Sequence, residues 1–193
     1  MNIIKKLIMQ KSGAVLFIGL CLIVILVFSF LSFKKASDAW TDYSSDNLGM
    51  EVEYPFKKLP VVHEEKGQHI TYTTTKGKQS FERLGTIVFK QTEEGPADLT
   101  ITADEFAFSN IQDWISWLEN FYGNSADVVI SKRVTIVGLQ GIIFQTNERG
   151  STTTTDGQNI AFLRNGTVYR ISARGFSEND FRRIWESFSF STK

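Results

Sequence analysis

One uninterrupted apolar run near the N-terminus constrains this chain more than any other feature. No charged residue occurs between Lys11 and Lys34, and Ala14 to Phe33 is almost wholly apolar. As a helix, these twenty residues would rise roughly 30 Å, which matches the hydrocarbon core of a bilayer. We therefore predict that residues 12–33 form a transmembrane helix that anchors the chain in a lipid bilayer.

The charges on either side of this run set its expected orientation. Lys5, Lys6 and Lys11 precede it, whereas Lys34 and Lys35 follow it, so the positive residues favour a cytoplasmic N-terminus by a small margin. A short N-terminal tail followed by a long hydrophilic portion usually has the same outcome. The sequence thus predicts a single-pass protein of the cell membrane, with tail residues 1–11 in the cytoplasm and the C-terminal portion outside it.

Two other interpretations of the run are a cleavable signal peptide and a lipid attachment site. A cleavable signal peptide has an apolar region of about 7 to 15 residues; Ser37-Asp38-Ala39 could serve as its cut site, but this run is longer. A lipid attachment site at Cys21 would follow a small residue, whereas Leu20 is bulky and further apolar residues come after the cysteine. We expect Cys21 to be a small apolar side chain in lipid, and cleavage of the anchor stays open as the alternative.

The portion after the anchor is acidic and contains no cysteine. The chain has 21 basic and 21 acidic residues, but five lysines are the only charged residues before Asp38, so residues 38–193 carry a net charge of −5. A mildly acidic surface repels phosphate backbones, which argues against nucleic-acid binding. Because Cys21 is the only cysteine, disulfides, thiol nucleophiles and thiolate metal sites are excluded from this portion.

Strand patterns dominate residues 50–190, which follow a polar segment at residues 34–49 that we interpret as a stalk. Met50 to Tyr54 alternates apolar and charged residues and ends before a proline, as a half-buried strand does. Asn165-Gly166 is the strongest hairpin signal, because both positions of a type I′ turn need positive φ. The other expected strands are Val61–His63, Gln68–Thr75, Phe81–Lys90, Leu99–Ala103, Val128–Val137, Ile142–Gln145, Gln158–Leu163 and Thr167–Ala173, with tight turns at Lys76–Lys78 and Gly138–Gly141.

Two segments show helical spacing instead. Ser109 with Gln112 has the pattern of a capping box, and an apolar stripe from Ile111 to Tyr122 follows it. Nearer the C-terminus, Phe176, Ser177, Asp180 and Phe181 fit a hydrophobic staple around an N-cap. The expected buried stripe beyond it consists of Phe181, Ile184, Trp185 and Phe188. We predict an α+β fold, in which a mostly antiparallel β-sheet is flanked by two amphipathic helices within one domain at residues 50–190.

Several segments resemble a known family. Leu48 to Pro55 resembles the opening strand of PsbP-like domains, which has the form Gly-apolar-x-x-x-Tyr-Pro, and Val134 to Gly141 and Gly166 to Ile171 are similar to later parts of that family's sheet. The Trp that often follows the Tyr-Pro is absent, and Phe56 to Leu59 stand in its place. The resemblance covers residues 40 to 190. It implies an α/β/α domain of the membrane-anchored bacterial envelope type that binds or assembles, and it assigns no site residue.

The ionisable residues do not form a recognisable catalytic or metal motif. His63 and His69 lie near two glutamates, but they lack the spacing of an HExxH-type ligand set, so we interpret them as surface histidines. Asp104 and Glu105 are adjacent, and adjacent strand residues face opposite sides, so they do not converge as a carboxylate pair. We interpret both as solvated loop charges.

Aromatic residues near the first predicted helix are the remaining candidates for a binding surface. Trp114, Trp117, Phe121 and Tyr122 could form a platform for carbohydrate or peptide, but their spacing favours core packing, with Trp117 the only one suspected of exposure. Ser151 to Thr155 is interpreted as an edge strand or a loop.

The sequence therefore predicts a membrane-anchored extracytoplasmic module that binds or helps assemble another envelope or membrane protein. We assign it no catalytic residue, no cofactor-binding residue and no metal ligand, and we expect no cofactor and no nucleic-acid partner. The lipid bilayer is a predicted partner through residues 12–33. The alternative is a cell-envelope hydrolase whose active site carries no recognised motif.

Overall fold

The computed structural model describes residues 40–74, 77–123, 125–148 and 157–191. The predicted transmembrane helix at residues 12–33 lies outside these residues, as does the Ser151–Thr155 segment. Within the described ranges, no helix is both long enough and apolar enough to cross a membrane. The chain divides into two compact units, Met1–Trp40 and Thr41–Lys193, and every strand and helix described here belongs to the second.

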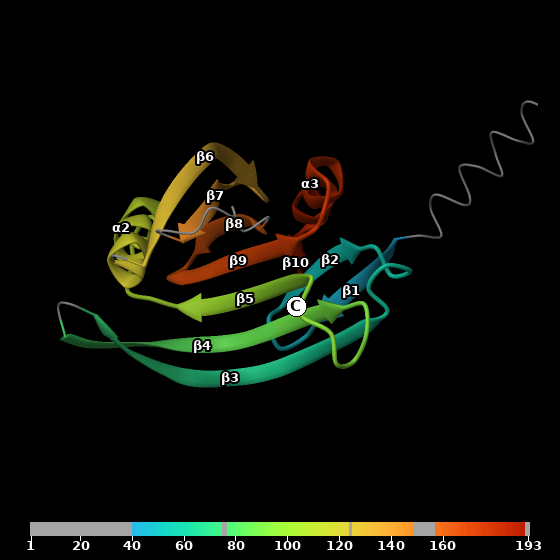
Figure 1. Cartoon of the computed structure of the whole chain (residues 1–193), viewed down its shortest axis with the longest axis horizontal. Coiled ribbons are helices and arrows are strands. Elements are labelled where there is room, and N and C mark those ends of the chain that lie inside the picture. Colours follow the sequence, from blue (N-terminus) through green and yellow to red (C-terminus); the bar gives the residue numbers. More distant parts are fainter. Residues whose placement is uncertain (1–39, 75–76, 124, 149–156, 192–193) are drawn as a thin grey trace, which may run out of the picture. The chain divides into compact units, whose positions relative to one another are not determined.

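The larger sheet of the described residues has seven strands, and every neighbouring pair in it is antiparallel (Figure 1). Its order is β3-β4-β5-β9-β8-β7-β6, so β3 and β6 form the two edges. The strands are β3 (Val61–Thr74), β4 (Gly77–Lys90), β5 (Leu99–Glu105), β6 (Ala126–Ile136), β7 (Leu139–Glu148), β8 (Gly157–Arg164) and β9 (Thr167–Arg174). The two extended pieces expected around Gly67 are therefore one continuous strand, β3.

A second sheet of three strands contains the start of the domain. β2 (Met50–Tyr54) pairs with β1 (Thr41–Ser45) on one side and with β10 (Ser189–Phe190) on the other. The sequence assigned residues 34–49 to a stalk, but Thr41–Ser45 is paired along its whole length and belongs to the fold. The polar composition of β1 hid it, because four of its five side chains are not buried.

The first helix in the described residues, α2 (Ile111–Tyr122), confirms the helical stripe but not its predicted cap. The N-cap is Asn110, whose Oδ1 accepts a hydrogen bond of 3.0 Å from the backbone N–H of Asp113. The capping box predicted at Ser109 and Gln112 is wrong by one position, since Ser109 instead donates from its hydroxyl to the Asp113 carboxylate. Ile111, Trp114, Ile115 and Leu118 form the buried stripe.

The second helix, α3 (Glu178–Ser187), begins as predicted. The hydroxyl of its N-cap, Ser177, accepts a hydrogen bond from the backbone N–H of Asp180 at 3.1 Å. Phe176 and Phe181 are both buried, as the hydrophobic staple requires. The predicted stripe is also buried, and it consists of Phe181, Ile184, Trp185 and Phe188.

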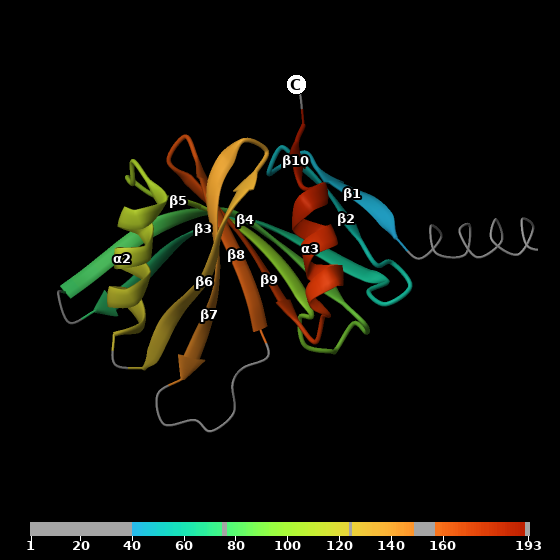
Figure 2. The same cartoon turned by 90° about the horizontal axis from the view of Figure 1, so that it is seen from above.

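The two helices cover opposite faces of the large sheet (Figure 2). Under α2 lie Ile142 and Phe144 of β7, Ala161 of β8 and Val168 of β9. The residues that alternate with these face the other side, which is covered by α3 and by the three-stranded sheet. On that side the Tyr54 ring of β2 lies 4.6 Å from the Phe89 ring of β4. The predicted α+β fold with mostly antiparallel sheets and two helices is confirmed for the described part of the chain.

Two tight turns connect neighbouring strands of the large sheet. Asn165 and Gly166 have φ values of 50° and 81°, as the predicted type I′ turn requires. The β6–β7 turn consists of Val137 and Gly138, with φ values of 49° and 77°, and is shorter than the predicted turn that ended at Gly141. Gly141 instead lies within β7, where an added Cβ would be only 3.0 Å from the carbonyl oxygen of Ala161.

Candidate functional site

A bulge in the edge strand β6 places two neighbouring side chains on the same side of the large sheet. Ile130 pairs with Phe144 and Lys132 pairs with Ile143, so Ser131 is an extra residue without a partner in the ladder. The Ser131 hydroxyl donates to the carbonyl oxygen of Ile143 at 3.1 Å. Such bulges re-aim side chains, and here both Ser131 and Lys132 line a cavity against α3.

The helix α3 supplies the facing wall from two adjacent rows of side chains. Phe181 and Trp185 are one turn apart and nearly completely buried, with exposed fractions of 1% and 9%. Glu178 and Arg182 are also one turn apart, and both are exposed. The apolar row forms the base of the wall, and the charged row forms its rim.

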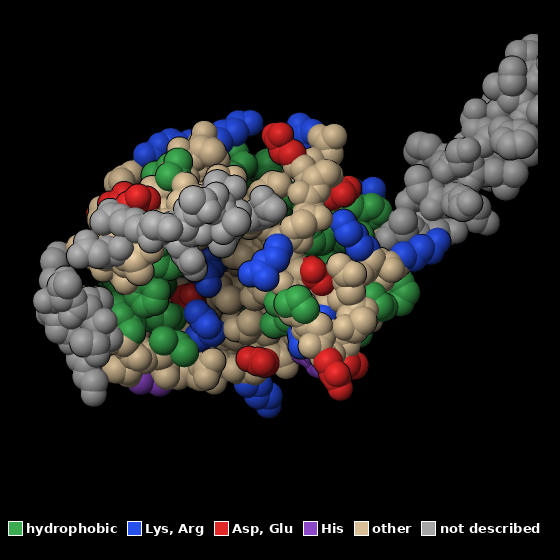
Figure 3. Space-filling model, viewed as in Figure 1, with side chains coloured by type: hydrophobic (Ala, Val, Ile, Leu, Met, Phe, Trp, Pro, Cys, Tyr) green, Lys and Arg blue, Asp and Glu red, His purple; other side chains and the backbone are tan. Residues whose placement is uncertain are grey.

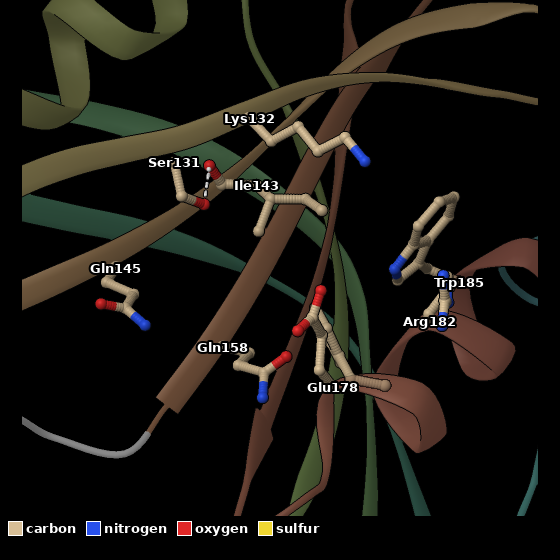
Figure 4. Close-up of a pocket in the computed structure, with 9 residues that line it drawn as sticks. Ser131, Lys132, Ile143, Gln145, Gln158, Glu178, Arg182 and Trp185 are labelled. Carbon is tan, nitrogen blue, oxygen red and sulfur yellow. Dashed lines mark hydrogen bonds between the residues drawn. The ribbon is translucent and has the colours of Figure 1, made fainter.

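The cavity between these elements has a volume of about 420 Å³. It is lined by Ser131, Lys132, Ile143, Gln145, Gln158, Glu178, Phe181, Arg182 and Trp185. Figure 4 shows Lys132 extending from β6 toward Trp185, and the Glu178 carboxylate pointing from α3 into the space between helix and strands. This volume is in the range of small-molecule and peptide-anchor sites.

The lining combines an apolar base with several polar groups of different kinds. Lys132 and Arg182 are cationic and Glu178 is anionic, while Gln145 and Gln158 each offer an amide donor and an acceptor. The nine lining residues, all within the described ranges, include neither histidine nor cysteine. The arrangement can hold an amphipathic group by burying its apolar part against Trp185 and bonding its polar part at the rim.

The two histidines do not come together. His63 Nε2 lies 2.9 Å from a carboxylate oxygen of Glu93, and His69 Nδ1 contacts the Glu82 carboxylate on the neighbouring strand. Both imidazoles are about half exposed, at 45% and 57% of their side-chain surface. The residues that the structure describes contain no group of three or more His, Cys, Asp or Glu side chains placed to hold a metal ion.

The interpretation of Asp104 as a solvated loop charge is wrong. Asp104 lies in β5, is only 7% exposed, and accepts two hydrogen bonds from the Arg83 guanidinium, at 2.7 and 3.3 Å. Glu105 is exposed at the end of the same strand. The two carboxylates do not converge, as predicted, because the backbone alternation separates them.

The predicted aromatic group is part of a larger cluster where α2 meets the β3–β4 hairpin (Figure 3). Trp114 is buried, and Trp117 is partly buried, with its indole N–H donating to the Tyr72 hydroxyl. Phe121, stacked on Trp117 at 5.3 Å, is 39% exposed. Trp117 is therefore not the exposed member of the set; Phe121 is. Tyr122 is partly buried.

No residue of the α3–β6 cavity was singled out as a site residue from the sequence. Trp185 and Phe181 were predicted as core, which they largely are. Ser131 and Lys132 are consecutive residues of an ordinary β-prone run, and only strand pairing shows that one is an extra residue. No signal in the sequence alone marks them.

Comparisons with known proteins find similarity among solved structures. No protein-family model matches the chain, and no curated protein matches it. Among solved structures, the chain is similar to the solution structure of cyanobacterial PsbP (CyanoP) from Synechocystis sp. PCC 6803, with 10% sequence identity and a TM-score of 0.45. The alignment covers 79% of this chain and 92% of that one.

Proposed function

We propose that this chain is a membrane-anchored module of the PsbP-like, bacterial envelope type, whose extracytoplasmic domain binds another envelope or membrane component without catalysing a reaction. The observation that carries the proposal is the cavity between α3 and the strands β6 to β8. Its base is apolar and its rim is charged, which suits recognition of an amphipathic group on a partner.

The predicted anchor supports the same function. A helix at residues 12–33 would confine the domain to the neighbourhood of the bilayer. Confinement raises the effective concentration of the domain for partners in the same membrane, so even a weak contact in the cavity suffices for assembly. The resemblance of Leu48 to Pro55 to PsbP-like domains agrees with a binding or assembly role.

The test compares two charge reversals on neighbouring residues of β6. Lys132 lines the cavity, whereas the Arg133 guanidinium donates to Gln112 of α2 on the opposite side of the sheet. We expect crosslinking in native membranes to capture the same partner with the full-length wild type and with Arg133→Glu, but not with Lys132→Glu. Both variants change the net charge equally, so non-specific electrostatic attraction predicts equal losses.

Two outcomes would count against the proposal. Equal capture by both variants would exclude the cavity as the binding site. Turnover of an envelope substrate by the purified chain, abolished by a cavity substitution such as Glu178→Gln, would favour the hydrolase alternative over a binding module.

A further inference from the structure

A row of polar side chains crosses the face of the large sheet that carries α2. Thr86 of β4 pairs with Thr102 of β5, and Thr102 pairs with Arg170 of β9. Directly paired residues point to the same side of a sheet, about 5 Å apart at their Cβ atoms. Thr86 and Thr102 are 8% and 2% exposed, and Arg170 is half-buried.

Two polar atoms in this row are buried without a partner. Neither Thr102 Oγ1 nor Arg170 Nε has a hydrogen-bond partner among the residues that the structure describes. A buried polar group that makes no hydrogen bond is costly, and a cationic one more so, so native proteins rarely keep such groups without a ligand, ion or water beside them. The two atoms belong to cross-strand partners, so one bound group could satisfy both.

Two polar groups near this row already have partners of their own. The Asp104 carboxylate, two residues along β5 from Thr102, is held in two hydrogen bonds by Arg83. The Ser172 hydroxyl, two residues along β9 from Arg170, donates to Asn159 Oδ1 at 2.7 Å. Within the described ranges, Arg170 has no ion-pair partner. Among the described residues, its positive charge is therefore available to pair with a bound anion.

We propose that Arg170 and Thr102 form a binding site for an oxyanion, that is, a carboxylate, phosphate or sulfate group of a ligand. The guanidinium presents its N–H groups in a planar fork that matches two oxygens of such a group, and the threonine hydroxyl can donate to one of them. The site lies on the opposite face of the sheet from the α3–β6 cavity and does not depend on the function proposed for that cavity.

The test is calorimetric titration of the full-length chain in detergent with phosphate, sulfate and acetate, at constant ionic strength balanced with chloride. We expect saturable binding of at least one oxyanion, with half-saturation on the order of 1 mM for a small ion. Arg170→Gln should weaken binding at least about tenfold, because the charge-assisted bonds are lost. Arg183→Gln, the same charge change at the exposed Arg183–Glu53 pair and outside the cavity lining, should leave binding unchanged. Acetate binding alone would identify a carboxylate ligand, and preference for phosphate or sulfate a phosphoryl or sulfuryl group.

Thr102→Val provides a second readout that a structural role alone would not produce. The substitution removes the unpartnered oxygen and keeps the shape, so the unfolding midpoint without oxyanion should rise, while oxyanion binding should weaken several-fold. The proposal is overturned if no oxyanion binds saturably, if Arg170→Gln binds as well as wild type, or if Arg183→Gln loses binding to the same extent. A fall in the unfolding midpoint of Thr102→Val would likewise count against it.

Discussion

The Arg83–Asp104 ion pair is the most enclosed of the ion pairs between described residues. Its side chains are 21% and 10% exposed, against 47% and 37% for the Arg183–Glu53 pair. Removing one partner from an enclosed pair leaves an uncompensated charge, whereas an exposed pair is screened by solvent.

We therefore expect Asp104→Ala to lower the free energy of unfolding by about 3 kcal/mol. Glu53→Ala, which breaks the exposed pair, should lower it by at most about 1 kcal/mol. Urea denaturation of both variants measures the difference. Equal losses would mean that Asp104 is effectively solvated, as the sequence alone suggested.

Tyr43 makes the free energy of unfolding depend on pH in the alkaline range. Its hydroxyl donates to Glu64 at 2.7 Å, and burial, followed by this hydrogen bond, raises the pKa of Tyr43 above its ordinary value of 10.0. The folded state therefore keeps this proton after the unfolded state has lost it. The stabilisation from the neutral hydroxyl is fully present below about pH 10 and is lost progressively above it.

Tyr43→Phe should change this dependence in a defined direction. The variant loses the hydrogen bond to Glu64, worth about 1 kcal/mol, so it is less stable than wild type at neutral pH. Between about pH 9 and about pH 11 the wild type should lose more stability than the variant, because only the wild type carries the titrating hydroxyl. Denaturation curves across this range test the sign, and parallel pH curves would contradict it.

At the scale of the element, the N-caps of α2 and α3 differ in how well the sequence predicted them. The α3 cap was predicted because Ser177 and the two flanking phenylalanines form one local pattern, and all of its contacts lie within a few residues. The α2 cap was misplaced because Ser109 and Asn110 are both good N-cap residues. Only the extended backbone of Asn110, with φ of −150° and ψ of 162°, identifies it as the cap.

A pair of alanine substitutions distinguishes the two candidate caps of α2. Asn110→Ala should lower the free energy of unfolding by about 1 kcal/mol, because the backbone N–H of Asp113 loses its acceptor. Ser109→Ala removes one exposed hydrogen bond to the Asp113 side chain and should cost a few tenths of that amount, on the order of 0.3 kcal/mol. Thermal or urea unfolding measures both losses. A larger loss for Ser109→Ala than for Asn110→Ala would support the predicted capping box at Ser109.

Strands were harder to delimit than helices for a physical reason. The alternation of Met50 to Tyr54 is strong because one face is buried, and β2 was predicted with its observed bounds. β6 has few buried side chains, since it is an edge strand, and its bulge reverses which residues face α3. After the bulge, the side chains that face each side of the sheet are exchanged. This exchange follows from the pairing with β7 and is not specified by residues 126–136 alone.

At the scale of the whole molecule, the candidate site could not be predicted, because its lining residues come from segments that are far apart in the sequence. Ser131 comes from a bulge in β6 and Trp185 from the C-terminal helix, and they line one cavity only after the large sheet has formed between α2 and α3. The fold class needed less information, because hairpin turns and two amphipathic stripes are local signals.

The predicted anchor is tested on the whole chain. If residues 12–33 span a bilayer, the full-length chain should stay in the membrane pellet after carbonate extraction, and removal of these residues should release it to the supernatant. Protease added to intact cells with an opened outer layer should digest the domain and leave the span protected. Release of the full-length chain by carbonate, or an N-terminus near Trp40 in the mature protein, would contradict a retained anchor.

The bulge at Ser131 also limits how copies of the protein can meet. If the predicted anchor confines the protein to one bilayer, copies collide often in two dimensions, and an unpaired edge strand is where such collisions lead to aggregation. Ser131 interrupts the regular spacing of the outward N–H and C=O groups of β6, and the positive charges of Lys132 and Arg133 follow directly after it. We therefore expect that the β6 strands of two neighbouring copies do not pair into one continuous sheet.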